Sequence, residues 1–443
     1  MQTQNRFIQV SALALGIAGA LAVGQAQASG FQLKENSVKA MGRAFAGSGV
    51  ATGDASVVVN NPATMTTFEG TTIQADINAT FDGGGFAGTG TPLARPLSGG
   101  DGGNNGGVTP IPAMSIIHKF GNGLTVGAMV SAPFGLKTEY EAGWVGRYQG
   151  LVSDLKTVDL TLSAAYEIVP DRFSVGAGLV YERAEAELSK AVDFGSLLAC
   201  AAVPGFAPQS ADGEAVIIGD DTGVGYIVGM NFRPTDKLAI GVSHRSEIDH
   251  VLQGEADWTV PGSARTVFNA IGRSALFNDG KASAKLTTPS VTSVSLAYQL
   301  NDNLSLMGDY AETDWHSLEE IRIDFANPDP DSVEDFSWGD TRFWSIGAEY
   351  KLSEAFTLRG GYAYDETPTT FATRSPRLPD EDRRWYSIGL TWNMSEHVEI
   401  NAAYTRIEPD KPKIGINDSS RHALFGDYAS DVNLFGVSGR YSF

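Results

Sequence analysis

Polar and apolar residues alternate along most of this 443-residue chain, from Phe68 to the last residue. In residues 343–352, for example, Trp344 and Ile346 share one face while Ser345 lies on the other. A period of two predicts β-strands with one apolar and one polar face, and we count fourteen such segments. They lie near residues 68–82, 110–121, 123–133, 153–169, 172–190, 221–233, 236–252, 283–300, 303–318, 337–352, 355–367, 381–394, 397–409 and 430–443.

Both the length and the connections of these segments indicate a membrane barrel. Strands of soluble proteins average about five or six residues, whereas a tilted strand needs about ten to cross a bilayer, and many segments here exceed that length. Tight turns such as Pro170-Asp171 alternate with long connections such as 191–220, which is typical of outer-membrane barrels. The chain also ends on an aromatic residue, Phe443. We therefore predict an all-β transmembrane barrel of fourteen antiparallel strands over residues 68–443.

Two segments precede the predicted barrel. Residues 1–28 contain Arg6, an apolar run over 10–23 and an Ala-Gln-Ala cleavage sequence, which together predict a secretory signal peptide. Residues 29–67 are rich in glycine and alanine and do not alternate. We predict that they form a compact N-terminal hatch packed inside the barrel. The alternative, from composition alone, is a disordered tail.

Charge and cysteine content exclude several partners and folds. The chain has 52 acidic and 32 basic residues and a net charge of −20. Nucleic acids and anionic lipids attract clustered lysine and arginine, so neither is an expected partner. The single cysteine, Cys200, cannot form an internal disulfide.

Few residues offer catalytic or metal-binding chemistry. The histidine–carboxylate pairs considered for catalysis are Asp314/His316 and Asp249/His250, which lie close in sequence. Because neighbouring strand residues face opposite sides, we expect no catalytic dyad and no enzyme. The acidic run 329–335 lacks the regular ligand spacing of a calcium loop and is expected to be a solvated surface. We expect no cofactor and no metal.

Short motifs follow one another in a specific order along the predicted mature chain. They are Ser29-Gly30-Phe31-Gln32-Leu33, Gly42-Arg43-Ala44, Asn61-Pro62-Ala63, Phe134–Tyr140, Asp159–Tyr166 and Leu378–Trp385. In this order the chain resembles the outer-membrane long-chain fatty acid transporters (FadL type), a family that includes the hydrocarbon-uptake proteins of aromatic-degrading bacteria. The resemblance implies a monomeric barrel closed by a hatch, an extracellular groove that captures ligand, a pocket beside the hatch, and sideways release through a gap in the wall.

The resemblance also assigns roles near the start of the barrel. Asn61, Pro62 and Ala63 match the hatch motif, and their chemistry predicts a rigid turn. Pro133 cannot donate a hydrogen bond to a neighbouring strand, and in the family a kink in this third strand opens the wall. The alternative is a strand that simply ends at its loop. The expected lateral gate consists of Ala132, Pro133, Phe134 and Gly135.

The predicted ligand pocket departs from the family pattern. Phe31 matches an aromatic residue that lines the family's pocket, but the two basic positions that meet a ligand carboxylate fall on Leu188 and Glu334. Basic residues nearby are Lys190, Arg183 and Arg342. A buried carboxylate without a partner is costly, so a neutral ligand stays open as an alternative. The expected pocket comprises Phe31, Arg183, Leu188 and Lys190.

Two extracellular connections are unusually apolar. Exposed apolar surface often marks a binding site, so we expect a capture groove here; the alternative is that these side chains pack on one another and cap the barrel. In the second connection, three of them are spaced as one face of a short helix. The residues are Phe194, Leu197, Leu198 and Phe206 in the first connection, and Val267, Phe268, Ile271, Leu276 and Phe277 in the second.

The expected function is passive uptake of long-chain fatty acids or similar hydrophobic molecules across the bacterial outer membrane. Each methylene kept out of water contributes about 0.8 kcal/mol, so release into the bilayer is easier than release into water. The expected surroundings are outer-membrane lipid and lipopolysaccharide. The alternatives are an uptake channel for neutral or aromatic hydrocarbons and, in a different class, a general diffusion porin.

Overall fold

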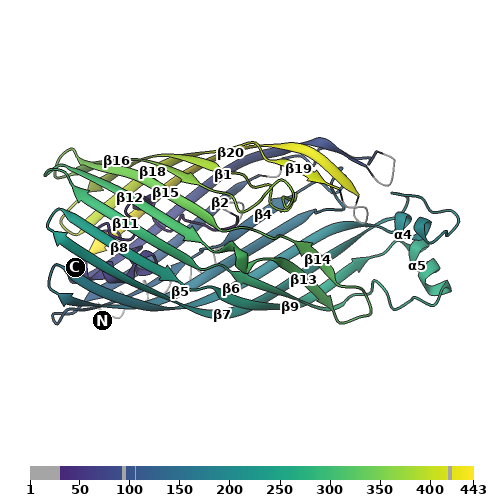
Figure 1. The fold of residues 1–443 in the computed structure, drawn as a ribbon, viewed down its shortest axis with the longest axis horizontal. Helices are drawn as coiled ribbons and strands as arrows, with labels where there is room; N and C mark the ends of the chain where they lie inside the picture. The colour runs from purple at the N-terminus through teal and green to yellow at the C-terminus, as the bar shows by residue number, and fades with distance from the viewer. Residues whose placement is uncertain (1–29, 92–95, 105, 418–421) are drawn as a thin grey trace, which may run out of the picture.

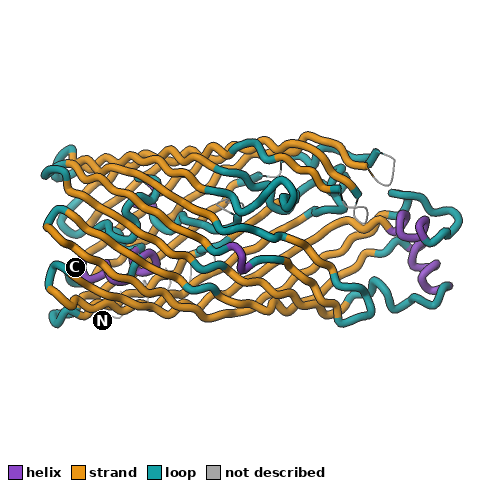
Figure 2. The backbone as a smooth tube through the Cα atoms, in the orientation of Figure 1, coloured by secondary structure: helices purple, strands orange, loops and turns teal. Residues whose placement is uncertain are grey.

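The computed structural model describes residues 30–91, 96–104, 106–417 and 422–443. The predicted signal peptide, residues 1–28, lies outside the described residues. Strands form the whole wall of one elongated barrel (Figure 1), with short helices inside one half of it and two more beyond its far end (Figure 2). Within the described part of the chain, no helix is long and apolar enough to cross a membrane.

The described strands and helices have the following bounds. The strands are β1 (Thr71–Thr91), β2 (Val108–Lys119), β3 (Leu124–Ser131), β4 (Gly135–Glu139), β5 (Val152–Val169), β6 (Phe173–Asp193), β7 (Asp212–Thr235), β8 (Leu238–Arg245), β9 (Ile248–Thr259), β10 (Gly280–Thr288), β11 (Val291–Gln299), β12 (Leu304–Thr313), β13 (Glu320–Phe325), β14 (Ser332–Asp335), β15 (Thr341–Lys351), β16 (Phe356–Asp365), β17 (Arg383–Asn393), β18 (Val398–Pro409), β19 (Lys413–Ile416) and β20 (Ala423–Ser442). The helices are α2 (Val38–Met41), α3 (Val57–Asn60), α4 (Phe194–Cys200) and α5 (Gly262–Ala270), with 3-10 turns η1 (Pro62–Thr67) and η2 (Trp315–Ser317).

Several of these strands are halves of one wall strand, so the wall has the predicted fourteen. The interrupted wall strands are β3 with β4, β8 with β9, β10 with β11, β12 with β13, β14 with β15 and β18 with β19. The barrel closes where β1 pairs antiparallel with β20 along its whole length, from Thr72↔Ser442 to Thr91↔Ala423. Because of this pairing, β1 continues to Thr91, although the sequence pattern predicted that the strand ends at residue 82 and that a connection follows. The glycine-rich stretch 83–91 has no apolar face, so its strand was not visible in the sequence pattern.

Alternation places apolar side chains outside and polar or small ones inside. On β15, Trp344 and Ile346 are 40% and 60% exposed, whereas Phe343 and Ser345 are buried. Outward aromatic residues pair across strands, as Tyr310 does with Trp344. Such an outward apolar face flanked by aromatic residues is what a lipid-facing barrel requires.

Residues 30–67, here named the plug, fill the barrel from within. Backbone and side-chain hydrogen bonds tie the plug to strands around the circumference: Val38 donates to Asp76 on β1 (2.9 Å), Gly49 to Ser295 on β11 (3.0 Å), and Asn61 to the Met230 carbonyl on β7 (3.0 Å). Small residues allow the close approach. A Cβ at Gly42 would lie 2.9 Å from the Gly389 backbone.

The predicted rigid turn at Asn61-Pro62-Ala63 is present. The Asn61 side chain accepts from the Ala63 N–H (3.2 Å) and begins η1, with Pro62 in its first turn. The same side chain also donates to the Gly49 carbonyl (3.0 Å). Asn61 therefore joins two parts of the plug to each other and to β7, a link that the sequence did not reveal.

Buried ion pairs anchor the end of the plug that lies among the short turns. Glu399 accepts from Lys39 of α2 (3.0 Å) and from Arg440 (2.6 Å), and Glu349 accepts from both Arg43 (3.0 Å) and Arg359 (2.7 Å). Both carboxylates lie near the ends of strands that are joined by short turns. We name this network the charged floor.

The charged floor makes a direct prediction about plug stability. Glu399→Gln removes the negative charge that Lys39 and Arg440 share, and breaking a buried ion pair costs about 3–5 kcal/mol. We expect a looser plug and a higher ion conductance of the purified protein in planar bilayers. Glu354→Gln is the matched control, because Glu354 pairs with Lys351 on a turn where its side chain is 93% exposed. Equal conductance of both variants and the unsubstituted protein would contradict this account.

Candidate binding cavity and break in the wall

The third wall strand is broken between β3 and β4. In the described part of the chain, β2 pairs with β3 only through residues 114–119, while β4 pairs with β5 alone. The remainder of β2, residues 108–113, pairs only with β1 among the described strands. The predicted interruption at Ala132–Gly135 is therefore confirmed as a structural feature, and it leaves two unjoined strand edges.

Proline chemistry explains why the edges do not join. Pro133 lacks the N–H that a ladder needs, and β2 contributes Pro110 and Pro112, two residues apart and hence on the same edge. Proline within a sheet is confined to edges and bulges. The prolines of β2 were missed in the sequence analysis, although the Thr-Pro-Ile-Pro stretch was a readable signal.

The start of the plug covers this break. The Leu33 N–H donates to the Pro133 carbonyl (2.7 Å) and the Gly135 N–H donates to the Phe31 carbonyl (2.8 Å), so Gln32 and Phe134 form an antiparallel bridge. The Leu33 side chain packs with Ile111 of β2 and with Ala132, which directly follows β3. Residues 31–33 therefore take the place of β2 along this part of the third wall strand.

An apolar cavity lies on the other side of Phe31. The Phe31 ring contacts those of Phe134, Trp315 and Trp338, with centroid distances of 5.9, 4.7 and 5.8 Å. Phe31 and Leu188 both line this cavity, as predicted. Its other apolar lining residues are Leu136, Leu155, Ala186, Ile217, Ile218, Leu252, Ala282, Ala284, Leu286, Ile321, Ile323, Phe336, Trp338 and Leu378.

Charged side chains mark one end of the apolar cavity. Glu334 and Arg377 line it, and Arg377 Nε lies 3.8 Å from Glu334 Oε1. Lys190 lies 4.0 Å from the same Glu334 carboxylate and donates to Ser332 (3.2 Å). Arg377 also donates to Ser153 (3.0 Å). Lys190 was predicted to belong to the pocket, but it does not line the cavity and only approaches it at Glu334, whereas Arg377, which lines the cavity from a loop, was missed.

The prediction that Arg183 faces this cavity is wrong. Its side chain is 52% exposed and pairs with Glu185 (2.9 Å) and Asp220 (3.3 Å). On β6 the buried neighbours are Glu182 and Ala184, so Arg183 lies on the opposite, outward face. Arg342 is likewise exposed on the outer face of β15.

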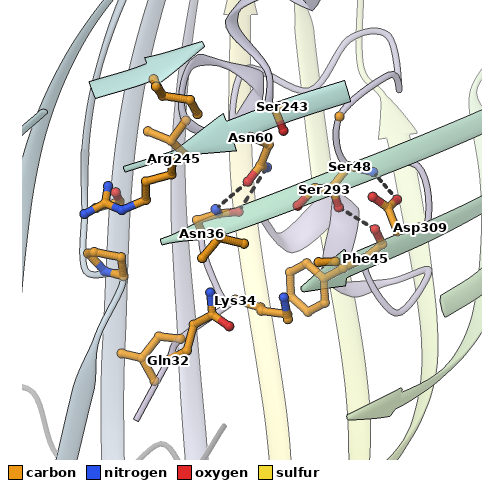
Figure 3. Close-up of a pocket in the computed structure, with 18 of the residues that line it drawn as sticks. Gln32, Lys34, Asn36, Phe45, Ser48, Asn60, Ser243, Arg245, Ser293 and Asp309 are labelled. Carbon is orange, nitrogen blue, oxygen red and sulfur yellow. Dashed lines mark hydrogen bonds between the residues drawn. The ribbon is translucent and has the colours of Figure 1, made fainter. Parts of the chain in front are cut away.

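A second, polar cavity lies between the plug and the wall (Figure 3). Gln32, Lys34 and Asn60 line it from the plug, and Arg245 and Asp309 line it from the wall. Arg245 is itself held by Asp159 (2.6 Å) and Glu182 (2.8 Å). The kink residues Ala132 and Pro133 border the same cavity. The break is thus reached from a polar space on one side and an apolar space on the other.

The apolar extracellular connections form helices α4 and α5 at the end of the barrel far from the short turns (Figure 1). Phe194, Leu198 and Phe268 are buried against one another, which matches the alternative of mutual packing. Leu197 and Ile271 remain about half exposed. Of the predicted groove residues, only these two therefore still offer a largely exposed apolar side chain to a ligand. Helix α5 ends at Ala270, and Ile271 lies at its C-terminal cap rather than on a helical face. The remaining predicted groove residues, Phe206, Val267, Leu276 and Phe277, are partly buried.

The two histidine–carboxylate pairs behave differently. Buried His250 contacts Glu182 inside the barrel (3.0 Å), while its neighbour Asp249 is exposed. The expectation that Asp314 and His316 face opposite sides is wrong, because they are two residues apart and both are exposed.

Comparisons with known proteins agree with this geometry. A family model described as "Outer membrane protein transport protein (OMPP1/FadL/TodX)" matches residues 19–443. The chain is 27% identical over 465 residues to outer membrane protein P1 of Haemophilus influenzae, covering 97% of this chain and 98% of that protein. It is 27% identical over 457 residues to the long-chain fatty acid transport protein of Escherichia coli K12, with the same coverage.

Solved structures show the same fold. A FadL homologue of Pseudomonas aeruginosa superimposes with a TM-score of 0.87 at 25% identity, covering 94% of this chain and 100% of that one. The toluene transporter TodX of Pseudomonas putida superimposes with a TM-score of 0.67 at 17% identity, with the same coverage. Because the identity to TodX is only 17%, this likeness shows a shared fold and does not show a shared ligand.

Phe31 is the residue whose loss tests the apolar cavity. Phe31→Ala removes a buried aromatic side chain, and burial of such a side chain contributes about 1.5–3 kcal/mol, which corresponds to a ten- to hundredfold change in affinity. We expect the affinity for oleate and for hexadecane to fall together, as measured by equilibrium binding to the detergent-solubilised protein. Phe371→Ala, at a 58% exposed position, is the control. Unchanged affinity of Phe31→Ala would show that ligands bind elsewhere.

Proposed function

The chain belongs to the family of outer membrane transport proteins described as OMPP1/FadL/TodX, and from that premise we propose that it takes up long-chain fatty acids and releases them sideways into the membrane. The family consists of outer-membrane transporters and channels, so the protein is an outer-membrane barrel and not an enzyme. Beyond that assignment, the proposal names the ligand and the path by which the ligand leaves the barrel.

One continuous stretch of the plug carries the proposed route. Phe31 lines the apolar cavity, while Gln32 and Leu33 cover the break in the wall. A ligand that displaces the Phe31 side chain therefore disturbs the two main-chain hydrogen bonds that hold the cover in place. Beyond Leu33 lie the unjoined edges of β2 and β4, and beyond them the lipid.

The charge distribution favours this sideways route. Straight passage would lead a hydrocarbon chain through the polar cavity and the charged floor, where Glu349 and Glu399 each hold two cations. Moving one methylene from an apolar site into water costs about 0.8 kcal/mol, so a long chain is strongly held back from that path. The break, lined by the apolar side chains of Leu33, Ile111 and Ala132, avoids the charged floor, although Leu33 and Ala132 also border the polar cavity.

The charged end of the apolar cavity supports a carboxylate as the head group. Arg377 and Lys190 supply two positive charges that can pair with a ligand carboxylate, alongside the negative charges of Glu334 and Asp154. The similar Escherichia coli protein is named a long-chain fatty acid transport protein, which supports the same cargo.

A neutral hydrocarbon is the second candidate cargo. Leu188 lines the cavity where the family resemblance led us to look for a basic residue, and the similar fold of TodX belongs to a toluene transporter. A general diffusion porin is less well supported, because the plug contacts strands around the barrel. We further propose that the protein acts as a monomer within lipid and lipopolysaccharide and that uptake is passive.

Replacing the two cations distinguishes the cargoes. In the double variant Lys190→Met/Arg377→Met, we expect oleate affinity to fall at least tenfold, about 1.4 kcal/mol, while hexadecane affinity stays the same. Arg183→Met is the matched control, because Arg183 lies on the outer face. Competition binding with the two ligands measures both effects. If oleate and hexadecane bind the unsubstituted protein equally well, the hydrocarbon cargo is favoured instead.

A disulfide tests the route independently of the cargo. Gln32 and Phe134 face each other as a non-hydrogen-bonded antiparallel pair, a spacing of about 4.5 Å between Cα atoms that suits a disulfide. In a Cys200→Ser background, we expect Gln32→Cys/Phe134→Cys to block oleate uptake into cells when oxidised. Reduction restores uptake, and each single cysteine variant is insensitive to oxidation. Uptake that is equal in oxidised and reduced protein would exclude movement of this cover.

A further inference from the structure

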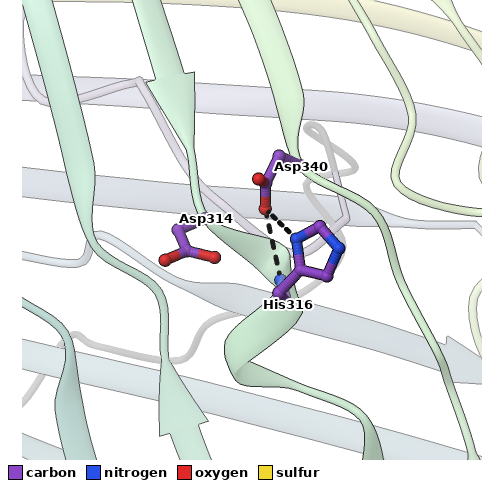
Figure 4. A group of neighbouring side chains, drawn as sticks. All are labelled: Asp314, His316 and Asp340. Carbon is purple, nitrogen blue, oxygen red and sulfur yellow. Dashed lines mark hydrogen bonds and ion pairs between the residues drawn. The ribbon is translucent and has the colours of Figure 1, made fainter.

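The outer surface of the barrel carries a mixed cluster of Asp314, His316 and Asp340 (Figure 4). The ladder between β12 and β15 ends at the pair Thr313↔Thr341. Asp314 directly follows Thr313 and Asp340 directly precedes Thr341, so both lie just beyond the end of the ladder. His316 lies in η2, the 3-10 turn that begins after Asp314. The cluster therefore joins two neighbouring wall strands at the point where the ladder stops.

All three side chains face the outside, above the lipid-facing band. Tyr310 and Trp344 are paired on the outer face of β12 and β15, and Asp314 follows four residues after Tyr310. At about 3.3 Å per strand residue, the cluster lies roughly 13 Å along the strand beyond this aromatic pair. The side chain of His316 is 70% exposed, so the cluster is open to the aqueous side of the membrane surface.

The geometry of the cluster matches a set of metal ligands. His316 Nδ1 lies 2.7 Å from Asp340 Oδ1, and one ligand atom from each of the three residues lies within 4.8 Å of the others. The set offers one imidazole nitrogen and two carboxylate oxygens. Together with an open position for water, this donor set is typical of zinc. Calcium and magnesium require about six or more oxygen ligands, which these residues do not supply.

The two carboxylates of the cluster also repel each other. Like charges directly opposite each other on neighbouring strands are destabilising, and the two carboxylates occupy such positions. A divalent cation between the carboxylates would relieve that repulsion.

We propose that Asp314, His316 and Asp340 form a surface site for a divalent transition-metal ion, with Zn²⁺ as the preferred occupant. The ion takes the place of the proton that now lies between His316 Nδ1 and Asp340 Oδ1. The ion would link the two strands just beyond the last pair of the β12–β15 ladder. Asp314 and His316 would bind it from the η2 side and Asp340 from the β15 side.

The site lies on the turn that positions Trp315, which packs against two aromatic residues of the apolar cavity. Trp315 stands between two of the ligands but faces inward, where it is fully buried. Its ring lies 4.7 Å from that of Phe31 and 5.1 Å from that of Trp338. A metal ion on the outer surface would therefore fix the same turn that supports the inner cavity.

Isothermal titration of tag-free, metal-stripped protein with ZnCl₂ tests the proposal. We expect one Zn²⁺ per chain, and His316→Ala and Asp340→Asn each to lower the affinity at least tenfold, since even residues outside the ligand set change metal affinity by about 10–100-fold. His397→Ala removes another exposed histidine, next to β18 at the opposite end of the barrel, and should leave the affinity unchanged. Ca²⁺ should not compete.

Two checks make the outcome decisive. Heat modifiability in gel electrophoresis confirms that each variant keeps its folded barrel, and Co²⁺ as a spectroscopic substitute reports nitrogen coordination only where His316 is present. The proposal is overturned if the unsubstituted protein binds no Zn²⁺, or if His316→Ala and Asp340→Asn bind it as tightly as the unsubstituted protein does.

Discussion

The main chain of a membrane protein must find its hydrogen-bond partners within the protein, because lipid offers none. A closed barrel meets this requirement, and here β1 and β20 complete the closure. The break between β2 and the third wall strand violates it locally, and residues 31–33 restore the lost partners at Pro133 and Gly135. The position of the plug's first residues thus follows from the break, and the break follows from prolines that cannot donate.

The division of polar and apolar groups inside the barrel follows from the same arrangement. The plug meets the wall through buried ion pairs at the end with short turns and through aromatic contacts around Phe31 further up. Between these regions lies the polar cavity lined by Arg245 and Asp309. A hydrophobic molecule therefore meets an apolar space first, and the break is the nearest exit that exposes no methylene to water.

Features with a local physical cause were predictable from the sequence. The fourteen wall strands follow from a period of two, and the interruption at Pro133 follows from the missing N–H of proline. The outward orientation of Arg183 was also predictable, because a period of two places it on the same face of β6 as the outward Leu179 and Tyr181. Arg377 was missed because its loop has no periodicity. The role of Leu33 depends on two strand edges that lie more than seventy residues away in sequence.

Photo-crosslinking with a diazirine-labelled oleate in outer-membrane vesicles tests sideways release most directly. The account predicts that residues at the break, Leu33, Ile111 and Ala132, become labelled together with Phe31 in the cavity above them. Labelling of the charged floor at Lys39, Glu349 and Glu399, without labelling at the break, would show that ligands pass straight through the barrel and would contradict the account.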